Sequence, residues 1–181
     1  WRTTQLEYTW LRSLMKRHKD FWQITEDSLD KSMKAFSIDP SMKNELMNLY
    51  KVLSPFKEVP ETLKKLKGKN FKLAILSNGT PSLLDELVKS NNLDKLFDDI
   101  FSIEEVGIYK PDSRVYDLPI KKYKIKNSEV IFLSANTWDV SGGGNYGYQS
   151  IWVNRNNNIF DNLDFNPSNQ IKDLTELVNL I

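Results

Sequence analysis

FKLAILSNGT, residues 71–80, is the stretch that decides the fold, because a buried strand is expected to end there at a polar turn. FKLAIL is an apolar run of strand length, and Ser-Asn-Gly has turn composition. Thr80 is an expected helix N-cap, and Pro81 suits the first helical position. Ligands of open α/β sheets bind at the carboxyl ends of strands, so Ser77 and Asn78 are candidate binding residues. The alternative interpretation, that Ser77-Asn78-Gly79 only forms a turn and binds nothing, stays open at this point.

The composition is that of one globular domain, or of one domain with a small insert. The 181 residues are 40% hydrophobic and 27% charged, with a formal net charge of +1. So small a charge gives no electrostatic case for nucleic acid or an anionic membrane as partner. No apolar run approaches the roughly 18 residues of a membrane span, and the start lacks a signal-peptide pattern. The absence of cysteine excludes disulfides and fits a cytoplasmic location.

The single histidine and the absence of cysteine narrow the chemistry. A cysteine nucleophile, a cysteine-based zinc site and an HExxH metalloprotease are excluded. His18 lies in a basic run, residues 16–19, and is expected on a solvated face. The chemistry must therefore come from Asp, Ser, Lys, Arg, Tyr or Asn side chains.

Residues 1–54 are expected to form a small helical bundle without strands. Apolar residues recur at helical spacing in three segments, which are residues 1–16, 22–36 and 39–53. Thr25 is expected near the N-cap of the second helix. The bundle is too small to be a convincing independent domain.

From residue 55 onward, helices and strands alternate, which predicts an α/β protein with a parallel, doubly wound sheet. Strands are expected at 71–76, 100–102, 129–134 and 150–153, and helices at 60–66, 81–90, 112–123 and 174–180. Gly68 is an expected left-handed C-cap, and Pro119 predicts a kink. The triplet Gly142–Gly144 is not a GxGxxG motif and gives no reason to expect a nucleotide.

Reactive side chains gather in three segments that follow predicted strands. These are Ser77-Asn78, then Lys110 with Tyr116 six residues later, and finally the segment 134–139, SANTWD. Each has an ordinary explanation by itself: a surface lysine, a core tyrosine, or an acidic N-cap at Asp139. In this order along the chain they are more specific.

The segments WRTTQLEYTWLRSLM, LAILSNG, YKPDSRVY and FLSANTWD resemble the haloacid dehalogenase superfamily, and within it the (S)-2-haloacid dehalogenases. The resemblance covers nearly the whole chain. It implies a Rossmann-like parallel sheet with helices on both faces and a helical cap inserted after the first strand. Residues 1–54 would then be the cap, and residues 55–181 an incomplete core.

The resemblance also implies roles for the polar residues. Ser77, with nearby backbone N–H groups, would bind the anionic group of the substrate, and Lys110 would orient and neutralise the nucleophile. Ser134, Asn136 and Asp139 would form the last catalytic loop, in which Asp139 positions or activates water.

Further residues match the family's substrate pocket. Arg2 matches the cap arginine that meets the departing halide or the substrate carboxylate, and Asn78 and Tyr116 would support the substrate. Leu6, Phe21 and Trp138 match the apolar part of the pocket.

The implied reaction is the hydrolytic dehalogenation of short (S)-2-haloalkanoic acids to (R)-2-hydroxy acids. A carboxylate displaces the halide and forms an ester, which water then hydrolyses. No cofactor or metal is expected. The superfamily's magnesium-dependent phosphatases are an alternative, but Ser134 and Asn136 stand neutral where acidic magnesium ligands would be needed.

The family's nucleophilic aspartate is not in this sequence. It belongs to a DxxGT-like loop after the central first strand, which would precede Trp1. Without that strand its two neighbours would each expose an unpaired edge. We therefore expect an incomplete record or a truncated product that is inactive alone, and an inactive protein with a binding role is a further alternative. Tyr8, Trp10 and Trp22 suit either a homodimer or packing of the cap on its own core.

Overall fold

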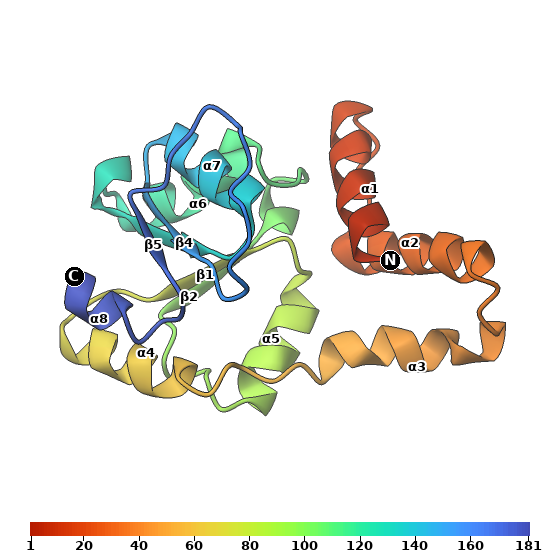
Figure 1. The fold of residues 1–181 in the computed structure, drawn as a ribbon, viewed down its shortest axis with the longest axis horizontal. Helices are drawn as coiled ribbons and strands as arrows, with labels where there is room; N and C mark the ends of the chain where they lie inside the picture. The colour runs from red at the N-terminus through yellow and green to blue at the C-terminus, as the bar shows by residue number, and fades with distance from the viewer.

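Two short parallel β-ladders form the centre of the core in a computed structural model that describes all of residues 1–181 (Figure 1). The first ladder pairs β1 (Ala74–Ser77) with β2 (Asp99–Ser102). The second has the order β3 (Ile131–Ser134), β4 (Gln149–Val153), β5 (Asn169–Ile171). The expected α/β class with parallel strands is confirmed. β1 and β3 each have a neighbouring strand on one side, so the sheet is divided between them.

Five helices connect and cover these strands. They are α4 (Val59–Gly68), α5 (Pro81–Ser90), α6 (Ser113–Tyr123), α7 (Thr137–Tyr146) and α8 (Leu177–Leu180). α5 has the expected bounds, because the Thr80 hydroxyl accepts a hydrogen bond from the Leu83 amide and Pro81 opens the helix. α6 runs through the buried Pro119, and its N-cap is Asp112, whose carboxylate accepts a hydrogen bond from the Arg114 amide.

The N-terminal helical region lies to one side of the strands in Figure 1. It consists of α1 (Arg2–Leu14), α2 (Phe21–Ala35) and α3 (Lys43–Asn48), with 3₁₀ turns at Pro40–Met42 and Leu49–Lys51. The expectation of Thr25 as an N-cap is wrong. Asp20 caps α2 by accepting from the Gln23 amide, and Thr25 is buried within the helix.

An apolar cluster packs the N-terminal helices against the core. Phe21 and Ile24 of α2 join Leu83, Ile103, Tyr109 and Val115 of the core elements. The Tyr109 hydroxyl, at the centre of this contact, donates a hydrogen bond to the Lys19 carbonyl at 2.7 Å. Tyr8 and Trp22 pack on the same cluster, so these residues are used within the chain, and a homodimer stays a prediction.

His18 is part of this contact rather than of a solvated face, which corrects the expectation from sequence. Its Nε2 lies 2.9 Å from Glu104 Oε2, and its ring is 5.4 Å from that of Tyr109. The residues around His18 could not indicate this pair, because Glu104 lies 86 positions away in the sequence.

The expectation about Gly68 is also wrong. Gly68 is the last residue of α4, and Asn70 takes the left-handed conformation after it (φ 63°). The triplet Gly142–Gly144 lies inside α7, where a Cβ on Gly142 would clash with the Tyr116 hydroxyl and one on Gly144 with the Phe165 ring. Glycine is tolerated in this helix because α7 packs so closely on these rings.

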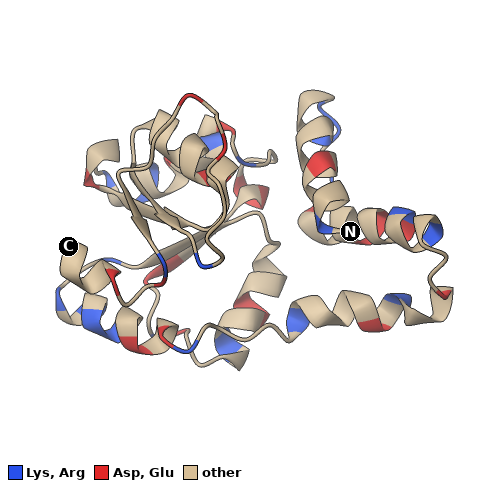
Figure 2. Cartoon of the chain, viewed as in Figure 1, with Lys and Arg blue, Asp and Glu red and all other residues tan.

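Basic and acidic residues both occur along the helices, as Figure 2 shows. No helix has both the length and the apolar composition that crossing a bilayer requires.

We expect the free energy of unfolding to fall as the pH rises above about 10. Burial raises the pKa of Tyr109 and of Tyr116, so both phenols stay protonated in the folded chain where unfolded tyrosines ionise. The stabilisation is complete below the unfolded pKa and is lost above it. In Tyr109→Phe the slope of unfolding free energy against pH should become shallower as the pH passes about 10, by up to about 1.4 kcal/mol per unit. Urea titrations between pH 9 and 11 measure this slope, and identical slopes would contradict the assignment.

Candidate active site

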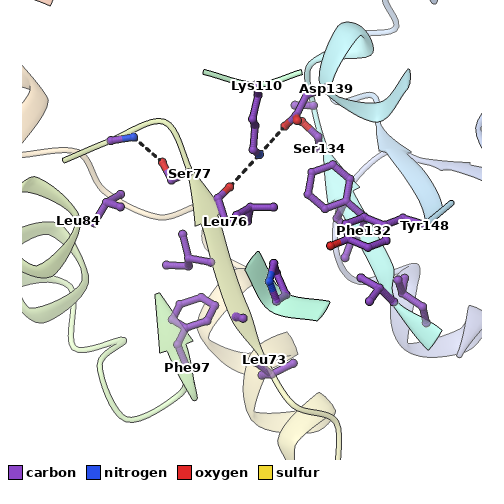
Figure 3. Close-up of a pocket in the computed structure, with 18 of the residues that line it drawn as sticks. Leu73, Leu76, Ser77, Leu84, Phe97, Lys110, Phe132, Ser134, Asp139 and Tyr148 are labelled. Carbon is purple, nitrogen blue, oxygen red and sulfur yellow. Dashed lines mark hydrogen bonds and ion pairs between the residues drawn. The ribbon is translucent and has the colours of Figure 1, made fainter. Parts of the chain in front are cut away.

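Lys110 lies buried at the carboxyl end of β1, with 4% of its surface exposed. Its ammonium donates hydrogen bonds to the Leu76 carbonyl at 2.8 Å and to Asp139 Oδ2 at 3.1 Å, as Figure 3 shows. Leu76 belongs to β1 and Asp139 to the first turn of α7, after β3. A single cation therefore connects the two halves of the divided sheet at their carboxyl ends.

Burial lowers the pKa of Lys110, because a low-dielectric site disfavours the ammonium, and the Asp139 carboxylate opposes this effect. The other oxygen of Asp139 accepts a hydrogen bond from the Tyr116 hydroxyl at 2.8 Å. Burial and the neighbouring carboxylate raise the pKa of Tyr116, which keeps the phenol a donor. Asp139 is thus held at both oxygens, in an orientation fixed by α6 and by the loop before it.

Tyr148 is a supporting residue that the sequence did not indicate. Its hydroxyl donates to the Tyr116 carbonyl, and its ring packs edge-on against that of Tyr116. Tyr146 completes the cluster, with its ring 6.0 Å from Tyr116. Only the spacing of aromatic residues in YGY, residues 146–148, could have suggested this cluster.

The turn after β1 is built around the Ser77 hydroxyl. Ser77 Oγ accepts from the Gly79 amide at 3.0 Å, and the Asn78 side-chain oxygen accepts from the Lys110 amide at 3.4 Å. A Cβ on Gly79 would approach Leu84 at 3.0 Å, which favours glycine here. Thr80 then starts α5, so the turn leads directly into a helix N-terminus.

The turn after β3 repeats this arrangement. Ser134 Oγ accepts from the Asn136 amide at 3.1 Å, and Asn136 is the N-cap residue of α7. The segment expected as the last loop is therefore a short turn followed by a helix. This correction arises because the three glycines of α7 disfavour a helix in a sequence-based reading.

These residues meet at one cavity of about 1050 Å³, whose lining is mostly hydrophobic. The predicted site residues that line it are Arg2, Phe21, Ser77, Asn78, Lys110, Ser134, Asn136, Trp138 and Asp139. Tyr116 lies behind Asp139 and is fully buried, and Leu6 is outside the cavity lining. The cavity thus brings residues of the N-terminal helices and of both ladders together.

Arg2 is oriented by buried polar residues that sequence reasoning missed. Its guanidinium donates to the Gln5 side-chain oxygen, and Gln5 donates to Thr25 Oγ1 at 2.5 Å. Gln5 and Thr25 are fully buried. In the sequence, Gln5 lies one helical turn after Arg2, and Thr25 one turn after Phe21. This spacing places each pair on one helix face, but it does not identify the hydrogen-bond partners.

Trp10 connects α1 to the site. Its indole N–H donates to the Lys110 carbonyl at 3.2 Å, and its ring lies edge-on to Trp138 at 5.5 Å. The N-terminal helices therefore touch the loop that carries Lys110. No cluster of three or more His, Cys, Asp or Glu residues in the chain could hold a metal ion.

Sequence comparison places the chain in a class of hydrolases. The profile of the haloacid dehalogenase-like hydrolases matches residues 11–153. The chain is 40% identical, over 99% of its length, to an (S)-2-haloacid dehalogenase of Pseudomonas sp. strain YL, of which it covers 78%. It is 39% identical to (S)-2-haloacid dehalogenase 1 of Pseudomonas sp. strain CBS-3, of which it covers 81%.

Solved structures of dehalogenases agree with the sequence comparison. A dehalogenase crystal structure superposes on the whole chain with a TM-score of 0.97 at 36% identity and is covered to 81%. The L-2-haloacid dehalogenase of Xanthobacter autotrophicus, with chloropropionic acid covalently bound, has a TM-score of 0.92 at 29% identity, with 99% of this chain and 83% of that one covered. The chain is therefore a member of the haloacid dehalogenase superfamily. Within it, the chain belongs to the (S)-2-haloacid dehalogenase family.

We predict that Lys110→Met lowers the free energy of unfolding by about 3 kcal/mol or more, because it leaves the Asp139 carboxylate buried without its cation. The side chains of this pair are 5% and 8% exposed. Lys121→Met is the matched control. It breaks a pair in which the lysine is 76% exposed, and should cost about 1 kcal/mol at most. Chemical denaturation measures both, and equal effects would contradict the prediction.

Proposed function

We propose that the protein of which these residues are part hydrolyses short (S)-2-haloalkanoic acids to (R)-2-hydroxy acids through an aspartyl ester. The observation that carries the proposal is the buried Lys110–Asp139 pair at the carboxyl ends of β1 and β3. Ser77, Asn136 and Arg2 line the same cavity. The covalently bound chloropropionic acid in the Xanthobacter autotrophicus relative supports an ester intermediate.

The substrate carboxylate needs an anion site, and the turn after β1 is well suited to be one. It offers the Ser77 hydroxyl and leads into the N-terminus of α5, where backbone N–H groups and the helix dipole favour an anion. In this proposal Ser77 and Asn78 bind the substrate carboxylate, and Lys110 faces the nucleophile.

In the first step, an aspartate oxygen attacks C2 from the side opposite the halogen. A C–O bond forms while the carbon–halogen bond breaks, and the halide leaves with the electron pair. Arg2 supplies a cation where that negative charge develops. Phe21 and Trp138, which line the cavity, exclude competing water and accept the alkyl group.

In the second step, water attacks the carbonyl carbon of the ester. Asp139 accepts a proton from this water, with Ser134 and Asn136 orienting it. The ester's C–O bond to the aspartyl carbon breaks, and the departing alkoxide takes back the proton that Asp139 accepted, so the hydroxy acid keeps the oxygen through which it was bound. The aspartyl carboxyl group that forms loses the water's second proton to solvent and returns as the aspartate. The configuration at C2 is inverted once, which gives the R product.

The nucleophile must come from outside residues 1–181 in this proposal. The acidic residues that line the cavity are Glu129 and Asp139. Asp139 pairs with Lys110 and is the proton acceptor of the second step, and Glu129 lies in the turn before β3, at the opposite end from Lys110. We therefore propose that the aspartate precedes Trp1 in a longer polypeptide.

The test is halide release from (S)-2-chloropropionate. The 181-residue chain alone should release none, whereas a polypeptide carrying the preceding segment should release chloride and form (R)-lactate in equal amounts. Lys110→Ala in the longer polypeptide should lower kcat/KM by about a hundredfold or more, since Lys110 faces the nucleophile and keeps it ionised. Lys121→Ala, on the exposed face of α6, is the control and should leave the rate unchanged.

The alternatives give different results. Phosphate release from p-nitrophenyl phosphate that requires Mg²⁺ would replace the proposal with a phosphatase. If the longer polypeptide shows neither halide release nor phosphate release, a binding role is favoured.

A further inference from the structure

We propose that Asn78 is a site of spontaneous deamidation, and that the hydroxyl group of Ser77 holds this reaction back in the folded chain. Asn78-Gly79 is the one place in the 181 residues where glycine follows asparagine. A following glycine favours deamidation, because it has no side chain to hinder the backbone nitrogen that attacks. The inference concerns the turn itself and is independent of the reaction proposed above.

The modification needs no reagent except water. The Gly79 backbone nitrogen loses its proton and attacks Cγ of Asn78, and the new N–C bond closes a succinimide ring. The bond from Cγ to Nδ2 breaks, and Nδ2 leaves as ammonia with the proton that the Gly79 nitrogen lost. Water then opens the ring at either carbonyl group, which gives aspartate or isoaspartate with a new carboxylate.

The Asn78 side chain is positioned as the electrophile of this reaction. Its Oδ1 accepts a hydrogen bond from the Lys110 backbone amide at 3.4 Å. Negative charge develops on Oδ1 when a nitrogen attacks Cγ, and a donor at this position stabilises that charge. Asn78 also lines the large cavity, which has room for the departing ammonia and for the water that opens the ring.

The nucleophile of the reaction, the Gly79 peptide nitrogen, is held back by two hydroxyl groups. Its N–H donates to Ser77 Oγ at 3.0 Å, and the Gly79 carbonyl accepts from the buried Ser102 Oγ at 2.7 Å. Attack requires the nitrogen to give up its proton and to turn toward Cγ of Asn78, so both hydrogen bonds oppose it. The turn therefore combines an activated side chain with a blocked backbone nitrogen, and the Ser77 hydroxyl is the group that blocks it directly.

Deamidation would change the chemical character of the turn after β1. It would place a carboxylate two residues before Thr80, the N-cap of α5. This carboxylate would repel other anions and would itself occupy the positive end of the helix dipole. The modified turn would thus lose the property that suits it to an anionic ligand.

The experiment incubates the folded 181-residue chain at mildly alkaline pH and physiological temperature. Mass spectrometry of the peptide that contains Asn78 follows the exchange of ammonia for water, and ion-exchange chromatography resolves the new negative charge. Ser77→Ala should deamidate Asn78 about fivefold faster than the unchanged chain, because the Gly79 N–H loses its acceptor. Ser102→Ala should change the rate in the same direction.

Ser134→Ala is the matched control. It removes the corresponding hydrogen bond of the turn after β3, in which Ser134 Oγ accepts from the Asn136 amide at 3.1 Å. It should therefore leave the rate at Asn78 unchanged.

Unfolding also frees the turn, so the same chains are compared in urea, and circular dichroism establishes that each variant is folded without it. In urea, Ser77→Ala and the unchanged chain should deamidate at the same rate, and faster than the folded unchanged chain. If Ser77→Ala does not fold, Ser102→Ala and the comparison of the unchanged chain with and without urea decide the question.

Three results would overturn the inference. Equal rates in the folded unchanged chain and in folded Ser77→Ala would show that the hydroxyl does not block the reaction. A slower reaction in Ser77→Ala would show that the hydroxyl promotes the attack. Equal rates in the unchanged chain with and without urea would show that the fold gives Asn78 no protection.

Discussion

The buried ammonium of Lys110 is the interaction on which the site depends. A cation this far from water is tolerated only when acceptors surround it, and here the Leu76 carbonyl and Asp139 provide them. These two acceptors belong to different halves of the divided sheet. Charge compensation therefore fixes the relative position of β1 and α7. Tyr116, held through its own carbonyl by Tyr148, then fixes the remaining oxygen of Asp139.

Much of this arrangement could be predicted from the sequence. Thr80 and Pro81 determined where α5 starts, because capping is a local interaction. Lys110 and Asp139 were expected near each other because both follow strands whose carboxyl ends share one edge of a parallel sheet. Which residues meet there depends on topology, and alternating helices and strands allow few topologies.

The elements that could not be predicted depend on contacts between distant residues. α7 contains three glycines, which oppose a helix locally, and it forms because Tyr116 and Phe165 pack where a larger side chain would stand. β5 has too short and polar a sequence, Asn-Gln-Ile, to indicate a strand without its partner β4. The pair His18–Glu104 and the contact from Arg2 to Gln5 show the same limit. Hydrophobic periodicity tells which face is buried, but it does not tell which polar groups meet.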